Sequence, residues 1–193
     1  MEIFENLMIM KRLLRQGWVR AGIPKSSIES LADHSWAVAA LTYLFVHLEN
    51  DLRKSKKLDT EKAILIALFH DFPESEYFDI DKSINNIIES NRLNEFLQEL
   101  EEGALEKLIE KTPNSLRNLF KKILADKNSE EYHIARIADL FDLLIQTRSY
   151  KKKHFLDEEQ FEAFQTNTMH QIKEYENQFF FIRTVLEDFN EFS

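Results

Sequence analysis

The chain has 193 residues and a formal net charge of −9, with no cysteine, three glycines and three prolines. The lack of cysteine excludes disulfides, thiolate nucleophiles and cysteine-ligated zinc, and the acidic balance disfavours nucleic acid or an anionic membrane as the main partner, because both are bound by clustered Lys and Arg. So few glycines and prolines disfavour a sandwich or barrel with many turns, and we expect an all-α protein.

The N-terminal part of the chain shows helical periodicity. A first helix is predicted at residues 2–16, ending at Gly17, where glycine commonly terminates helices. Its predicted apolar side comprises Phe4, Leu7, Met8, Leu13 and Leu14. Residues 18–30 are expected to form a connection. A long helix at 31–54 carries apolar residues at spacings of three and four that align with His34, so this histidine is expected to face inward.

The next predicted helix begins at an N-cap, Asp59 or Thr60, and ends where Pro73 interrupts it. It is strongly apolar up to Phe69, and His70 and Asp71 follow directly, at a helix end or kink. A buried ionisable group is neutralised, paired or bound to a metal, because burying it alone is costly. The His-Asp pair therefore predicts one of these arrangements.

Periodicity resumes near residue 81 and continues, as one helix or two, until Pro113; a short helix is then expected at 115–125. Ser129 is expected to cap a helix that reaches Tyr150. The centre of that helix is apolar nearly all round, except at Arg136, Asp139 and Asp142. This pattern predicts a central helix with a buried carboxylate.

The last part of the chain contains a predicted capping box, Asp157 with Gln160, which would open one long helix at 158–191. No internal repeat or linker marks a second domain. The N-terminus lacks the pattern of a signal peptide, and no apolar run approaches the ~20 residues of a membrane span. We therefore expect a cytoplasmic protein that makes no membrane contact.

Polar groups on the apolar faces of three predicted helices form one candidate site. They are His34, the His70–Asp71 pair and Asp139. Two imidazoles and two carboxylates suit one divalent ion of Mn, Fe, Co, Ni, Zn or Mg, with positions left for water and substrate. A lone inward histidine is more often a hydrogen-bonded core residue, so this expectation depends on the four residues together.

Four stretches, RQGWVRAGI, ESLADHSWAVA, ALFHDFPESEYFDI and IADLFDLLIQ, resemble in their order and separation the HD-domain phosphohydrolases, and particularly the 5′-deoxynucleotidases among them. The resemblance covers about residues 10–146 and implies a compact multi-helix HD-domain bundle. With the final helix, residues 1–193 would form a single HD domain. The resemblance also implies that one divalent metal is bound by His34, His70, Asp71 and Asp139.

The same resemblance implies roles for four further residues. Glu74 would orient or deprotonate the attacking water, and Asp79 would meet the nucleoside sugar. Trp18 and Arg15 match a tryptophan and an arginine that the family places near the sugar and phosphate of the ligand. Glu74 and Trp18 also have purely structural interpretations, because a glutamate is favourable in a first helical turn and a tryptophan is favourable in a core. Phe78 departs from the glycine that the family commonly has there, so the loop at the sugar site is expected to differ.

The implied activity is removal of the 5′-phosphate from deoxyribonucleoside monophosphates by metal-activated water, with the nucleotide as a small-molecule partner. A homodimer is also expected, from the resemblance and from the apolar run at 179–182, which would be exposed unless it is core.

Two alternatives to this activity stay open. One is a nucleotide-sensing or scaffold module with a structural metal and no turnover, which Glu74 disfavours. The other is hydrolysis of a triphosphate, cyclic nucleotide or alarmone, which the short chain without a long basic insertion disfavours.

Overall fold

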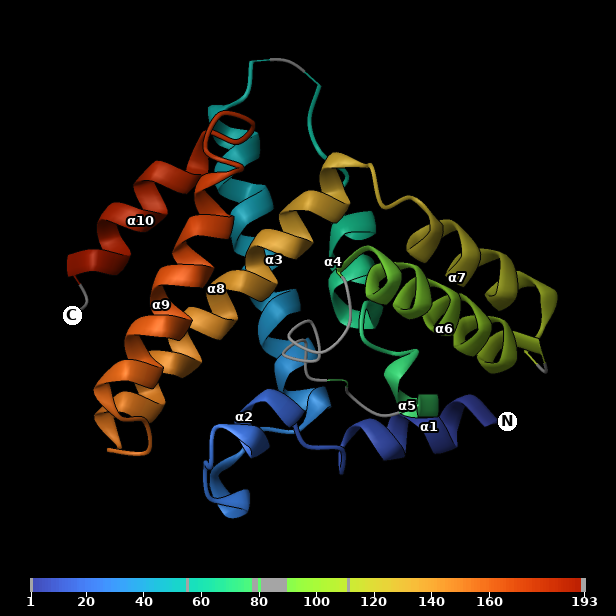
Figure 1. Ribbon diagram of the computed structural model, residues 1–193. Helices are drawn as coiled ribbons and strands as arrows, with labels where there is room; N and C mark the ends of the chain where they lie inside the picture. Colours follow the sequence, from blue (N-terminus) through green and yellow to red (C-terminus); the bar gives the residue numbers. More distant parts are fainter. Residues whose placement is uncertain (1, 55, 78–79, 81–89, 111, 192–193) are drawn as a thin grey trace. The chain divides into compact units, whose positions relative to one another are not determined.

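The structure, a computed structural model, describes residues 2–54, 56–77, 80, 90–110 and 112–191. In these ranges the regular structure is helical, apart from one isolated antiparallel bridge between Leu14 and Ser30 (Figure 1). The chain divides into two compact units, residues 1–35 with 69–125 and residues 36–68 with 126–193. The all-α fold class is confirmed, whereas the single domain stays a prediction.

The first unit holds α1 (Glu2–Met10), α2 (Gln16–Arg20), the short helix η1 (Lys25–Ser27), the start of α3 (Leu31–Leu52), the end of α4 (Thr60–Phe69), α5 (Glu74–Tyr77), α6 (Ser90–Glu110) and α7 (Asn114–Ala125). Its core comprises Ile3, Met10, Leu31, Phe72, Leu108, Ile109 and Phe120. The rings of Phe72 and Phe120 stack with centroids 5.8 Å apart, and Phe69 meets Phe72 edge-on at 5.7 Å. These aromatic contacts anchor the segment that follows α4.

The predicted helix at 2–16 is divided in the structure. α1 ends at Met10, and a separate helix, α2, begins at Gln16 and includes Gly17. The predicted apolar side was also wrong in part, since three of its residues are exposed: Phe4, Leu7 and Met8. The buried residues of α1 are instead Ile3, Asn6 and Met10. Hydrophobic periodicity missed this face because its central residue is polar.

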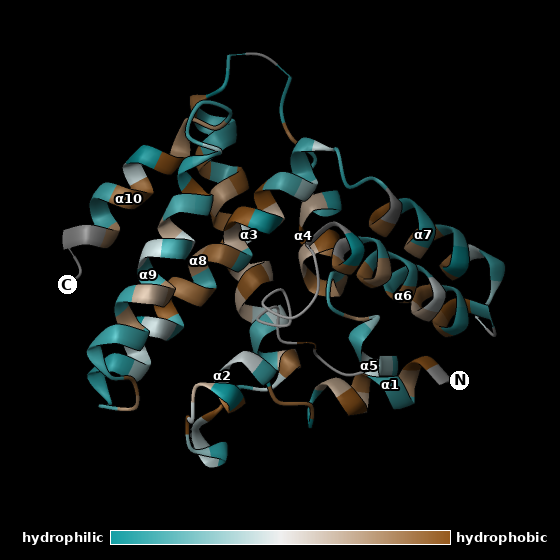
Figure 2. Cartoon of the chain, in the orientation of Figure 1, coloured by the Kyte–Doolittle hydropathy of each residue, from teal (hydrophilic) through white to brown (hydrophobic). Residues whose placement is uncertain are grey.

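The second unit holds the remainder of α3 and α4 together with α8 (Glu130–Lys152), α9 (Glu158–Lys173) and α10 (Phe181–Glu191). α8 and α9 lie side by side, and α9 shows hydrophilic and hydrophobic residues alternating along its turns (Figure 2). Two predicted helix starts are confirmed. Ser129 Oγ accepts the Tyr132 N–H at 3.3 Å, and Asp157 forms the expected capping box with Gln160.

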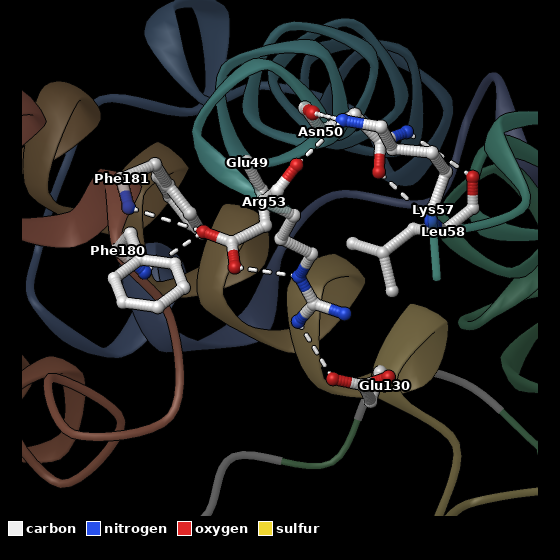
Figure 3. A network of polar contacts seen from close by, with 8 residues as sticks. All are labelled: Glu49, Asn50, Arg53, Lys57, Leu58, Glu130, Phe180 and Phe181. Atoms are coloured by element: carbon white, nitrogen blue, oxygen red, sulfur yellow. Dashed lines mark hydrogen bonds and ion pairs between the residues drawn. The ribbon is translucent and has the colours of Figure 1, made fainter. Parts of the chain in front are cut away.

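The predicted single helix at 158–191 is wrong, because α9 ends at Lys173 and α10 begins at Phe181. The reason lies in α3. Oε2 of the fully buried Glu49 accepts the backbone N–H groups of Phe180 at 2.8 Å and Phe181 at 3.1 Å (Figure 3). A carboxylate satisfies the donors that a helix leaves open at its N-terminus and interacts favourably with the helix dipole. This distant residue therefore stabilises a new helix start.

Glu49 belongs to a chain of charged contacts within the second unit. Arg53 Nε donates to Oε1 of Glu49 at 2.7 Å, and its Nη2 donates to Glu130 at 2.6 Å (Figure 3). The hydrogen bond from Arg53 holds the pKa of Glu130 below its ordinary value, although burial acts in the opposite direction. The chain of contacts links the end of α3 to the starts of α8 and α10.

The apolar run at 179–182 lies mostly in the core. Phe179, Phe181 and Ile182 are buried, and Phe180 alone in the run is exposed. The Phe181 ring stacks on Phe45 of α3 with centroids 4.8 Å apart. The expectation that this run forms an exposed patch was therefore wrong, and it gives no support to a dimer.

Candidate active site

Three of the predicted metal ligands meet within the first unit. α4 ends at Phe69, and His70 and Asp71 lie in the turn that leads to α5, as the sequence predicted. His34 lies near the start of α3 and is 1% exposed. Its Nε2 is 3.5 Å from Asp71 Oδ2, while Nε2 of His70 is 3.2 Å from Asp71 Oδ1. Both imidazoles therefore face one carboxylate.

This arrangement fits a divalent metal ion. The donor atoms of His34, His70 and Asp71 all lie within 4.8 Å of one another. Metal–ligand bonds of roughly 2.0–2.2 Å allow atoms at such separations to share one ion, and two nitrogens with one carboxylate oxygen suit borderline divalent metals. The described residues thus supply three convergent donors from two separate segments of the chain.

Asp139, the fourth predicted ligand, lies in the second unit on α8. It is buried, 8% exposed, as the apolar pattern of that helix predicted. Its Oδ2 accepts a hydrogen bond from Arg136, which lies one turn earlier on the same helix. Its participation in the metal site stays a prediction.

The charge of Asp71 is set by its neighbours. Burial would raise the pKa of this carboxyl, but His70, Arg15 and His34 outweigh burial and hold the pKa well below its ordinary range. Arg15 Nη1 donates to Asp71 Oδ2 at 2.9 Å. Because metals bind deprotonated ligands, a carboxylate that stays ionised is suited to the role predicted for Asp71.

Arg15 is placed by the connection between α1 and α2. Its backbone N–H donates to the carbonyl of Glu29 at 3.3 Å, beside the bridge between Leu14 and Ser30. The side chain is 21% exposed and reaches Asp71. The structure thus brings the predicted phosphate-binding arginine to Asp71, one of the predicted metal ligands.

Glu74, the predicted catalytic carboxylate, is the first residue of α5. Its backbone N–H donates to the Asp71 carbonyl at 3.0 Å, so one short turn connects the two residues. One of its carboxylate oxygens, Oε2, is shielded from solvent. The structure places Glu74 directly after the metal-ligand turn, and its catalytic role stays a prediction.

Trp18 and Asp79 were predicted to contact the sugar. Trp18 lies in α2, is 3% exposed, and donates its indole N–H to Oε1 of Glu29 at 2.9 Å. No local sequence pattern predicts the role of Glu29, because its partner lies in another element. Asp79 and Phe78 lie outside the described residues, so the sugar-binding roles stay predictions.

Comparison with known proteins places these residues in a wider context. A family model described as 5′-deoxynucleotidase YfbR-like matches residues 2–189. The chain is 28% identical over 151 residues to the 5′-deoxynucleotidase YGK1 of Saccharomyces cerevisiae, which covers 77% of this chain and 65% of that protein. It is 28% identical over 115 residues to the 4′-phosphooxetanocin A phosphatase of Priestia megaterium, covering 59% of this chain and 57% of that protein. The chain thus spans less than two thirds of either relative.

Solved structures show the same fold. An HD-domain phosphohydrolase from Listeria innocua superposes with a TM-score of 0.77 at 23% identity, covering 97% of this chain and 87% of that one. A protein from Pyrococcus horikoshii gives a TM-score of 0.70 at 26% identity, covering 97% and 94%. The predicted HD-domain bundle is confirmed. Within the described ranges, no helix combines the length and apolarity needed to cross a membrane.

Proposed function

Since the chain belongs to the YfbR-like 5′-deoxynucleotidase family, we propose that it removes the 5′-phosphate from deoxyribonucleoside monophosphates. The observation that carries this proposal is the convergence of His34, His70 and Asp71, with donor atoms within 4.8 Å of one another. These residues would hold one divalent ion, with Asp139 as the proposed fourth ligand. When bound, such an ion acidifies water and offsets the charge of a phosphate.

Each of the residues around this site would have its own role in the reaction. Glu74 would accept a proton as a water molecule attacks phosphorus, the bond from phosphorus to O5′ would break, and a proton would return to O5′, so that the products are the deoxynucleoside and inorganic phosphate. Arg15, which reaches Asp71, would hold two phosphate oxygens through its planar guanidinium. Trp18 and Asp79 would contact the sugar. Because the indole N–H of Trp18 already donates to Glu29, Trp18 would contact the sugar through its ring carbons.

The activity is tested by a phosphate-release screen of the purified protein. Deoxyribonucleoside and ribonucleoside monophosphates, triphosphates, cyclic nucleotides and an alarmone would each be supplied with Mn, Co, Ni, Fe, Mg or Zn in turn. We expect preferred release from deoxyribonucleoside monophosphates, and none after chelation. Tight nucleotide binding without release under every metal would instead identify a sensing module, and preferred release from another nucleotide class would overturn the proposed substrate.

A homodimer formed through α3 is also part of the proposal. The exposed half of this helix carries five apolar residues, which form a stripe that winds across it: Trp36, Tyr43, Leu44, Leu48 and Leu52. Trp36 is 71% exposed, which is unusual for a large apolar side chain. If two copies pair antiparallel about Leu44, then Trp36 opposes Leu52 of the other copy, since both lie equally far from Leu44. Such a self-complementary stripe suits a two-fold interface.

Light scattering tests the dimer. The wild type should have about twice the chain mass of 23.0 kDa, and Leu44→Glu should be monomeric. Phe96→Glu is the matched control, because Phe96 is an exposed apolar residue of a different helix, α6. A monomeric wild type at micromolar concentration removes the proposal.

We further propose a cytoplasmic location, where free deoxyribonucleotides are made and consumed.

A further inference from the structure

A polar side chain lies among the apolar residues on the buried face of α1. Asn6 is 2% exposed and lies on this face between Ile3 and Met10, both of which belong to the core of the first unit. Burying an amide costs free energy unless its groups are hydrogen-bonded. The contacts of Asn6 therefore explain why an asparagine is tolerated at a core position.

Asn6 binds the two residues that follow Glu74. Its Nδ2 donates to Oγ of Ser75 at 3.0 Å and to Oε1 of Glu76 at 2.8 Å. Oγ of Ser75 in turn donates to the carbonyl of Phe72 at 2.8 Å. The other carboxylate oxygen of Glu76 is ion-paired with Lys107 of α6. The Asn6 amide thus connects α1 to a short hydrogen-bonded network around α5.

The orientation of α5 depends on contacts with the residues around it. α5 has only four residues, Glu74–Tyr77, and isolated helices of this length are unstable in water. Its position depends on Phe72, which is fully buried before it, on the contacts of Asn6 within it, and on the ion pair of Glu76 with α6. The first residue of the same helix is Glu74, one short turn after Asp71.

We propose that Asn6 is a positioning residue for the reaction. By holding Ser75 and Glu76, it sets where the Glu74 carboxylate lies relative to Asp71. Asn6 itself touches neither substrate nor metal in this proposal, and its effect on turnover passes through Glu74. The inference rests on the proposed function, in which Glu74 accepts the proton of the attacking water.

Replacement of Asn6 tests this role. Asn6→Leu keeps a similar volume but removes both donors, and we expect kcat to fall about 10- to 100-fold, as for a displaced catalytic group. KM and metal content should be unchanged. Ile3→Ala is the matched control, since it leaves a cavity on the same buried face of α1 but removes no hydrogen bond to α5; its kcat should stay at the wild-type level. Ser75→Ala, a milder change, should lower kcat in the same direction.

A double variant separates positioning from general destabilisation. In a Glu74→Ala background, Asn6→Leu should cause no further fall in turnover, because the group it positions is already absent. A structural role would lower turnover by the same factor in both backgrounds, and this result would overturn the proposal. Wild-type kcat in both Asn6→Leu and Ser75→Ala would overturn it as well.

Hydrogen exchange gives a readout that does not depend on activity. The backbone amides of Ser75 and Glu76 should exchange faster in Asn6→Leu than in the wild type or in Ile3→Ala. Unchanged exchange at these amides would remove the physical basis of the inference. If the wild type hydrolysed no nucleotide, the proposed function would fail, while faster exchange would still show that Asn6 holds α5.

Discussion

The guanidinium of Arg15 lies 2.9 Å from the carboxylate of Asp71, a residue predicted to bind a metal ion. The two residues are 56 positions apart in the sequence and meet within the first unit. An arginine beside a cation site is favourable when an anion also binds there, because the anion compensates both positive charges. This contact therefore supports a phosphate-binding role for Arg15.

Replacing Arg15 should weaken nucleotide binding without loss of metal. We expect Arg15→Met to lower kcat/KM about 10- to 100-fold, the range for a lost charge-assisted hydrogen bond, mainly through a higher KM. Steady-state kinetics and metal analysis would measure both effects. Arg12→Met, at an exposed position nearby, is the control and should behave as the wild type. An unchanged KM in Arg15→Met would move the phosphate site elsewhere.

The metal assignment predicts loss of the ion from single variants. The wild type should retain one divalent ion per chain after dialysis, whereas His70→Ala and Asp139→Ala should lose it together with activity, because each removes one ligand of the same ion. His47→Ala, which alters an exposed histidine of α3, should retain it. Stoichiometric metal in both His70→Ala and Asp139→Ala would show that the assignment is wrong.

Glu74 should be needed for chemistry but not for binding. Glu74→Ala should keep the ion and bind nucleotide, while turnover falls by the ~10²- to 10⁴-fold associated with a lost general base. If Trp18 and Asp79 contact the sugar, calorimetry on this variant should show tighter binding of a deoxyribonucleotide than of its ribonucleotide counterpart, because an added hydroxyl needs room and a partner.

Glu99→Ala, at an exposed position on α6, provides the control for Glu74→Ala and should turn over substrate normally. Wild-type turnover by Glu74→Ala would assign proton transfer to another group. Equal affinities for the deoxyribonucleotide and ribonucleotide would discard the proposed sugar contacts of Trp18 and Asp79.

Glu49 should be essential for the stability of the second unit. Glu49→Ala leaves Arg53 without one of its two carboxylate partners and removes the acceptor for the first N–H groups of α10. Breaking a buried charge pair of this kind costs about 3–5 kcal/mol, so urea unfolding of Glu49→Ala should show a large decrease in the free energy of unfolding. This decrease should be smaller for Glu49→Gln, which retains a hydrogen-bond acceptor. Glu187→Ala, an exposed change on α10, should have little effect, and a similar result for Glu49→Ala would contradict the capping role.

The sequence by itself determined the features that depend on neighbouring residues. Helical periodicity predicted α3 and α8, and local capping patterns predicted the starts at Ser129 and Asp157. The apolar run before Pro73 placed His70 and Asp71 at the end of a helix, where the structure has them. These signals are readable because caps, prolines and helical faces involve residues within one or two turns of one another.

Only the tertiary structure decided the features that depend on distant partners. The start of α10 is stabilised by Glu49, 131 positions before Phe180, and Asn6 enters the core because Ser75, 69 positions later, accepts its hydrogen bond. Helical periodicity predicted the wrong buried face for α1 and one continuous helix in place of α9 and α10. It considers only the polarity of each residue and not the partners that the residue meets in the fold. A polar group can be buried at low cost once a partner is present, and folding alone brings these partners together.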